Sequence, residues 1–90
     1  MARVLFTRNL RSLFPGLEEI EVSGATVADV VAGLESHHPG LTAYILDERG
    51  AVRKHVNIFV DETLIADRIR LSDPVGDGVR IHIIQALSGG

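Results

Sequence analysis

The sequence predicts an α+β fold, in which a mixed sheet of four to five strands carries one main helix packed on one face. Three observations support this prediction. Several short segments alternate apolar and polar residues, which is the pattern of half-buried strands. One segment has apolar residues at helical spacing instead. These segments follow one another as two strands, a helix and further strands, an order that places the helix against a single sheet.

The first two strands are expected at residues 3–7 and 17–22, joined by a loop that contains the turn signal Phe14-Pro15-Gly16. In the second strand, apolar and acidic residues alternate, so one side faces the core and the other faces solvent. In the first strand, Leu5 falls on the side that points away from the core.

The helix is expected to begin at Thr26. Thr26 and Asp29 form a capping-box pattern, with Asp in the place where Glu or Gln is usual. Pro39-Gly40 ends the helix. Its apolar stripe consists of Val27, Val30, Val31 and Leu34.

The rest of the chain supplies the remaining strands. Residues 41–46 are apolar but long enough only for a short helical turn, and residues 55–60 alternate as a strand. A brief edge strand is expected at 63–65, and the last strand at 79–84 follows the turn cluster at 73–78. A ferredoxin-like fold would need a second full helix, so the order of elements favours a β-grasp arrangement.

Leu5, Phe59 and Ile84 are large apolar residues on the solvent side of their strands. In a β-grasp sheet the first, third and last strands are neighbours, so these side chains can form one patch. Single apolar residues on a surface are common and need no explanation. A cluster of such residues near the C-terminal end of the chain indicates a surface that docks a partner protein.

Composition excludes several classes of protein. Ninety residues make one domain. The nine basic and twelve acidic residues are interspersed, with no basic stripe for nucleic acid. No apolar run is long enough to span a membrane, which predicts a cytoplasmic protein without membrane partners. The chain has no cysteine, so thiol nucleophiles and zinc–thiolate sites are excluded. No histidine or carboxylate cluster has metal-ligand spacing, and no catalytic constellation is present, so neither a metal site nor an enzyme is expected.

The C-terminal sequence "IQALSGG" divides the chain into a folded domain, residues 1–86, and a flexible tail, residues 87–90. The tail consists of Leu87, Ser88, Gly89 and Gly90. A frayed end or a cloning remnant is the simple alternative. A terminal glycine pair also suits a tail that threads a narrow channel, because glycine lacks Cβ and adopts backbone angles closed to other residues.

Four segments together resemble the ThiS/MoaD family of ubiquitin-like sulfur carriers, with most similarity to the small subunit of molybdopterin synthase. They read "RVLFTRNLRSLF", "TVADVVAGLESHHPGL", "HVNIFVDE" and "DPVGDGVRIHIIQALSGG". The resemblance implies a β-grasp fold, no catalysis by the carrier and no bound cofactor. It further implies that a ubiquitin-activating-like enzyme uses ATP to adenylate Gly90. A sulfur donor then converts the adenylate to a thiocarboxylate, whose sulfur passes to an accepting enzyme such as the large subunit of molybdopterin synthase.

Two departures and two alternatives accompany this resemblance. Family members often have Asn-Gly where this chain has Asp61-Glu62, and many have proline near Gln85-Ala86.

Molybdopterin synthesis is the first choice of pathway, with thiamine or cysteine synthesis also open. The principal alternative is a ubiquitin-like modifier that is conjugated through Gly90 to lysines of other proteins. A third reading is a β-grasp interaction module whose glycines are incidental.

Overall fold

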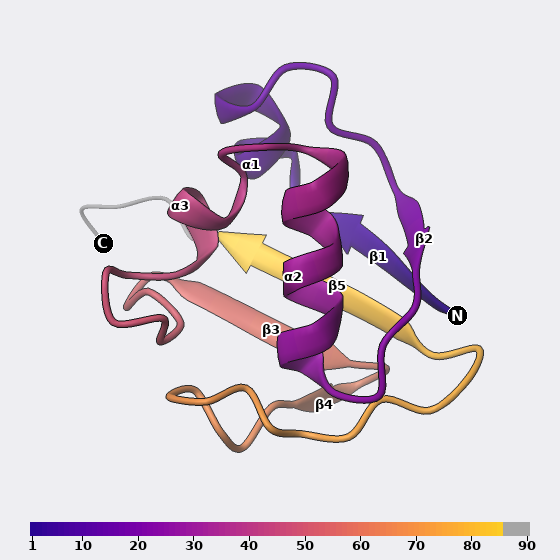
Figure 1. The fold of residues 1–90 in the computed structure, drawn as a ribbon. Helices are drawn as coiled ribbons and strands as arrows, with labels where there is room; N and C mark the ends of the chain where they lie inside the picture. Colours follow the sequence, from indigo (N-terminus) through magenta and orange to yellow (C-terminus); the bar gives the residue numbers. More distant parts are fainter. Residues whose placement is uncertain (86–90) are drawn as a thin grey trace.

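The computed structural model describes residues 1–85 of the chain. The expected tail, residues 87–90, and the end of the predicted domain at residue 86 therefore lie outside the described residues. In chain order the elements are β1 (Ala2–Phe6), α1 (Arg8–Leu13), β2 (Ile20–Val22), α2 (Val27–His37), α3 (Thr42–Ile45), β3 (Val56–Val60), β4 (Thr63–Leu64) and β5 (Arg80–Gln85) (Figure 1).

The strands form one mixed sheet in the order β2-β1-β5-β3-β4. The first and last strands of the chain are parallel neighbours, with Val4 opposite Ile81, and the other pairs are antiparallel. A parallel pair requires a crossover connection, which here contains every other element of the chain, including α2. The predicted α+β fold with a β-grasp sheet is confirmed.

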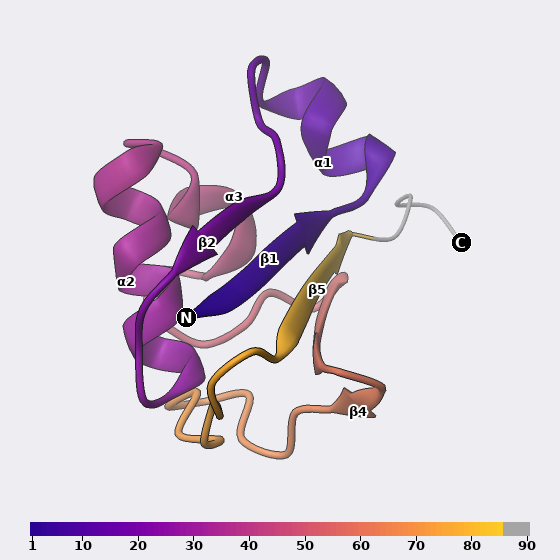
Figure 2. The same ribbon diagram turned by 90° about the vertical axis from the view of Figure 1, so that its right-hand side faces the viewer.

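Helix α2 covers one face of this sheet (Figures 1 and 2). The predicted stripe Val27, Val30, Val31 and Leu34 is buried, together with inward residues of the strands such as Val4, Ile58 and Ile83. The predicted capping box forms, because the Thr26 hydroxyl accepts from Asp29 N and the Asp29 carboxylate accepts from Thr26 N.

Helix α2 also approaches β2 closely. A Cβ atom added at Gly33 would lie 2.5 Å from Cγ1 of Val22, so a side chain at position 33 would force the two elements apart. A larger residue here is expected to move α2 away from the sheet.

The segment between the first two strands differs from the prediction. Residues 8–13 form helix α1 instead of a loop, and residues 17–19 are not part of the strand, which begins at Ile20. Helix α1 buries only Leu10, so it has no apolar stripe that periodicity could detect. Leu17, outside any strand, is nevertheless buried.

The turns that follow α2 and β3 behave as predicted. The short helix α3 confirms the helical turn expected at 41–46. Phe14 contacts both His38 and Tyr44 edge-on, at ring-centroid distances of 5.8 and 6.0 Å. Asp61 takes a left-handed conformation (φ 54°), which Asp tolerates better than most residues. The departure from Asn-Gly is therefore accommodated within the turn. Within residues 1–85, no helix has the length and apolar character needed to cross a membrane.

Candidate functional site

The face of the sheet opposite α2 carries a row of side chains across four strands. Leu5 on β1 lies opposite His82 on β5, and His82 lies opposite Phe59 on β3. Phe59 in turn lies opposite Leu64 on β4. Because directly opposed residues of a ladder point to the same side, these four residues share the outer face.

Ile84 lies two residues beyond His82 on β5, on the same side of the sheet, and pairs with Asn57. It is therefore a diagonal neighbour of Phe59. We call Leu5, Phe59, Leu64 and Ile84 the outer patch. The structure thus brings together all three of the residues that the sequence predicts for docking.

The outer patch is separate from the hydrophobic core. Leu5, Phe59 and Ile84 are half-buried, and none of them is among the partly buried residues that pack against the core, as Phe6 and Val60 do. Leu64 is 47% exposed, which marks it as the most accessible member. Sequence reasoning missed Leu64, because a strand of two residues has no alternation from which its outward side could be read.

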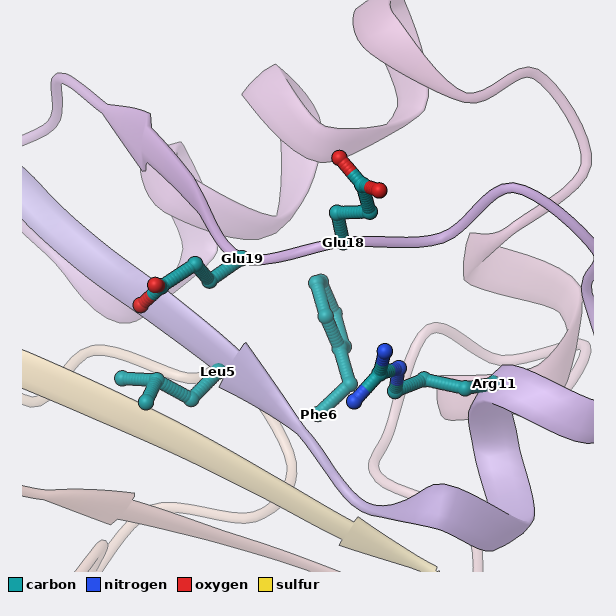
Figure 3. A pocket seen from close by; sticks show the side chains of 5 residues that line it. All are labelled: Leu5, Phe6, Arg11, Glu18 and Glu19. Atoms are coloured by element: carbon teal, nitrogen blue, oxygen red, sulfur yellow. The ribbon is translucent and has the colours of Figure 1, made fainter.

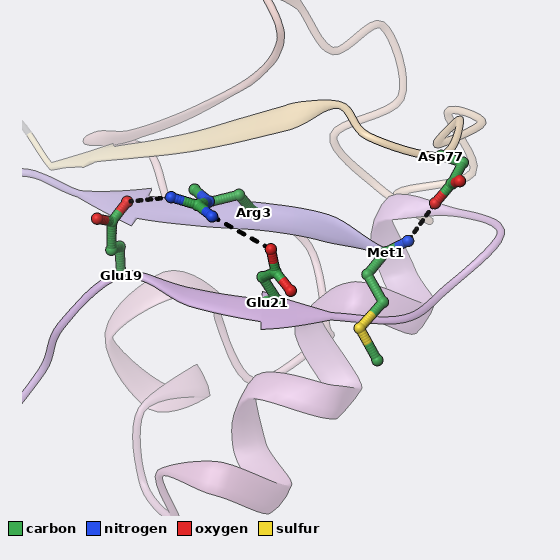
Figure 4. A network of polar contacts seen from close by, with 5 residues as sticks. All are labelled: Met1, Arg3, Glu19, Glu21 and Asp77. Atoms are coloured by element: carbon green, nitrogen blue, oxygen red, sulfur yellow. Dashed lines mark hydrogen bonds and ion pairs between the residues drawn. The ribbon is translucent and has the colours of Figure 1, made fainter.

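Charged residues border the outer patch toward the beginning of β1. Arg3 contacts Glu21 at 3.2 Å and Glu19 at 3.7 Å, and lies opposite Arg80 on β5 (Figure 4). The N-terminal amine also pairs with Asp77. An apolar centre with a charged rim is the usual composition of a protein–protein interface.

A depression of about 400 Å³ lies beside the Leu5 end of the outer patch. Figure 3 shows the Phe6 ring pointing toward the segment before β2, with the Arg11 guanidinium beside it. The depression exists because β2 pairs with β1 only as far as Val4, so the chain diverges from β1 beyond that point. On the β1 side, the outer patch is therefore bordered by this depression and not by a further strand.

The other part of the candidate site is the root of the tail, at the end of β5. Gln85 lies opposite Val56 of β3, and its N–H donates to the Thr7 hydroxyl of the β1 end at 3.4 Å. A groove of about 620 Å³ adjoins this point. It is lined by Ala43, Tyr44, Asp47, Arg53, Lys54, His55, Val56 and Gln85.

The predicted tail residues Leu87, Ser88, Gly89 and Gly90 lie outside the described residues, so the structure does not place them. One member of the outer patch, Ile84, lies on β5, which is the last described element before residues 86–90. Within residues 1–85, no group of three or more His, Asp and Glu side chains is arranged to hold a metal ion.

The sequence and this fold are shared with a known protein family. The sequence model of the ThiS family matches residues 4–90. The chain belongs to the ThiS family. Its β-grasp, ubiquitin-like fold agrees with this assignment, and the resemblance read from the sequence is confirmed.

Individual relatives point in the same direction. The sulfur carrier protein CysO of Mycobacterium tuberculosis is 28% identical over 83 residues, covering 90% of this chain and 89% of its own length. The structure is similar to a chain of the Amycolatopsis orientalis BexX/CysO complex, with a TM-score of 0.84 and 27% identity over 100% of both chains. The small archaeal modifier protein 1 of Methanosarcina acetivorans has a TM-score of 0.77 and 28% identity, over 99% of this chain and 95% of its own.

These comparisons confirm the coarse functional prediction, a non-catalytic sulfur carrier of the ThiS and CysO type. They do not single out molybdopterin synthesis, which the sequence analysis placed first. The pathway, the activated residue and the partners remain proposals, and the cytoplasmic location stays a prediction.

Proposed function

We propose that Gly90 is adenylated by an ATP-dependent activating enzyme and then converted to a thiocarboxylate that donates sulfur. The observation that carries this proposal is the family match, which extends through residue 90 and so includes Gly89 and Gly90. A carboxylate is a poor electrophile. Transfer of AMP from ATP to the Gly90 carboxylate releases pyrophosphate and gives a mixed anhydride, from which a sulfur donor displaces AMP.

The composition of the chain suits this chemistry. With no cysteine, no side chain can hold a persulfide, so the chain end is the position left for transferable sulfur. Glycine at the last two positions leaves the reacting carbonyl unshielded and lets the backbone enter a narrow site. The carrier itself binds no cofactor in this proposal, and ATP belongs to the partner.

We further propose that the sulfur enters a CysO-type pathway, with cysteine synthesis as the first destination to test. Support comes from the similarity to CysO carriers over nearly the whole length of both chains. Molybdopterin and thiamine synthesis are the other destinations left open by the sequence. The Amycolatopsis CysO structure is a complex with BexX, which supports a function that depends on a partner enzyme.

A second candidate function is protein modification, in which Gly90 is joined to a lysine of another protein. The similarity to an archaeal modifier protein favours it. Both functions begin with the same adenylate, so the activating step does not separate them. The acceptor does, because one product is a sulfur-containing metabolite and the other is a conjugated protein.

The outer patch is the surface we assign to partner docking in either function. One of its members, Ile84, lies on β5, the strand that precedes the tail in the chain, and the charged border of the patch resembles an interface rim. An activating or sulfur-accepting enzyme that covers the outer patch would at the same time receive the tail.

Intact-mass measurement of the protein purified from its own cells tests the proposed function. A thiocarboxylate appears as replacement of one oxygen by sulfur, whereas a conjugate appears as a much heavier species. In addition, removal of Gly90 should abolish carrier-dependent ATP–pyrophosphate exchange by the activating enzyme. A Ser88→Ala variant, which keeps both glycines, is the matched control. Full exchange with the shortened chain contradicts the proposal.

A further inference from the structure

We propose that basic residues around the root of the tail dock against acidic side chains at the mouth of the activating enzyme's channel. We call Arg8, Arg53 and Lys54 the basic collar. This inference rests on the proposed function and names the chemistry of the partner surface that receives the tail.

The topology of the sheet places the basic collar. At its last described residue, β5 lies between the end of β1, through the Gln85 N–H to Thr7 Oγ1 bond, and the start of β3, through the Val56 pairing. The chain carries Arg8 immediately after Thr7, and Arg53 and Lys54 shortly before Val56. The two strands that flank the root of the tail therefore both connect to basic residues at this end of the sheet.

The charges of the basic collar are available to a partner. All three residues are exposed, and none of them is in a salt bridge within residues 1–85. Arg53 and Lys54 line the groove next to Gln85, and Arg53 is held there because its Nε donates to the Ala43 carbonyl at 2.8 Å.

One acidic residue shares the groove with these cations. The Asp47 carboxylate is engaged in its own turn, where Oδ1 accepts from Arg49 N at 2.8 Å and from Ala51 N at 3.1 Å. It therefore does not neutralise Lys54 through an ion pair. In a chain of net charge −3, the groove beside Gln85 thus carries two cationic side chains and one anionic side chain, a local excess of positive charge.

The position of the basic collar determines which partner groups it meets. Five residues follow Gln85, and an extended chain of five residues spans at most about 17 Å. The reacting end can thus reach well into a channel, while the basic collar stays at the entrance. Carboxylates at that entrance, rather than the phosphates of ATP deep in the site, are the complementary groups. Such rim pairs mainly accelerate encounter and lose their effect at high salt.

The test measures affinity and exchange kinetics with the cognate activating enzyme for the double variant Arg8→Glu, Lys54→Glu. At about 0.05 M salt we expect a KM for the carrier at least roughly tenfold higher, with kcat unchanged, and a difference that shrinks at about 0.5 M salt. Calorimetric titration should show the same loss of affinity. The control Arg70→Glu reverses one charge, where the double variant reverses two. Arg70 lies in a loop that contacts the N-terminal end of α2, through the Ala28 N–H to Leu71 carbonyl bond.

The outcomes separate this inference from the proposed function. The proposed role of the basic collar is overturned if the double variant binds the activating enzyme as tightly as the wild type does. It is also overturned if Arg70→Glu loses as much affinity as the double variant. Absence of exchange with the wild-type carrier contradicts the proposed function instead, while the titration still measures whether the basic collar contributes to binding. Melting curves of each variant verify that these exposed substitutions leave the fold intact.

Discussion

Acidic side chains stabilise the described part of the chain mainly by accepting backbone hydrogen bonds. Glu35 accepts from Gly40 N at 2.8 Å, from Thr42 N at 3.1 Å and from the Thr42 hydroxyl at 2.7 Å. These bonds, the one from Gly40 first, hold the pKa of the Glu35 carboxyl below its usual value. Glu35 thereby connects the end of α2 to α3, so it is not an inert surface position.

Asp67 makes the most hydrogen bonds of this kind and carries a prediction about acid stability. Donation from Arg70 N, and then from the Ser72 hydroxyl, lowers the pKa of Asp67 from 3.8 to about 2. Because the pKa is lower in the folded state, the stabilisation is present above about pH 4 and is lost as the pH falls toward 2. We expect Asp67→Asn to have a lower Tm than the wild type at pH 7. The difference in Tm should become smaller as the pH falls from about 4 toward 2.

Melting curves between pH 2 and 7 measure this effect. Glu48→Gln is the control, since Glu48 is exposed and its side chain makes no hydrogen bond or ion pair within residues 1–85. If the difference in Tm between Asp67→Asn and wild type is the same at pH 2 as at pH 7, the ionised carboxylate is not the source of the stabilisation.

Helix α2 holds the sheet together through its buried stripe. Val31 is 3% exposed, whereas the next residue, Ala32, is exposed on the other side of the same helix. We expect Val31→Asp to destabilise the protein by about 3 kcal/mol or more, because it buries an unpaired charge. Ala32→Asp makes the same helix more acidic without burial, and should cost under about 1 kcal/mol in urea unfolding. Similar losses for both variants would contradict the packing described here.

Arg68 completes an open edge of β3. The strand β4 pairs only with Phe59 and Val60, so the beginning of β3 has no neighbouring strand on the side away from β5. The Arg68 guanidinium donates to the carbonyl oxygens of Val56 and Arg53, both at 2.7 Å, and to Asn57 Oδ1 at 3.1 Å. One side chain thus takes the place of a strand.

We therefore expect Arg68→Ala to lower the free energy of unfolding by about 1.5–3 kcal/mol, the range for hydrogen bonds to a charged group. Arg68→Lys should recover only part of this loss, because an ammonium group lacks the planar fork that reaches several acceptors. Urea unfolding measures both variants. Arg70→Ala, whose guanidinium makes no hydrogen bond within residues 1–85, should change stability little, and a loss as large as that of Arg68→Ala would argue against this role.

The elements that sequence could predict are those in which burial repeats with a regular period. Helix α2 has four buried residues at helical spacing, and buried and more exposed residues alternate along β3 and β5. Both the kind of element and the side that faces the core could therefore be predicted from the sequence. Helix α1 has one buried residue and a Thr7 cap without a side-chain hydrogen bond, so neither periodicity nor capping indicates it. The role of Arg68 depends on residues 11 to 15 positions away, beyond any local pattern.

The molecule as a whole has two dissimilar faces. Helices α2 and α3 cover one side of the sheet (Figure 2). The strand pairings place the outer patch on the opposite side. The candidate site could be predicted in part, because the outward phase of Leu5, Phe59 and Ile84 is a property of single strands. Their placement in adjacent rows, with His82 between Leu5 and Phe59, required the register of the sheet.

This division of faces gives a prediction about partner binding. If the outer patch docks the activating enzyme, Leu64→Asp and Phe59→Ala should each weaken binding by about 2 kcal/mol, or roughly thirtyfold, as is typical of central apolar contacts. Leu64 is the more decisive position, because it is 47% exposed and its replacement should leave folding stability within about 0.5 kcal/mol.

Calorimetric titration against the activating enzyme measures these losses, alongside melting curves of the free variants. Ala32→Asp, which introduces the same residue at an exposed position of α2 on the opposite side of the sheet, serves as the control and should bind as wild type does. Normal binding by both patch variants would make the outer patch ordinary surface. A fall in Tm for Phe59→Ala comparable to that of Val31→Asp would instead place Phe59 in the core. Loss of binding by Leu64→Asp at unchanged Tm is the result expected of a docking surface.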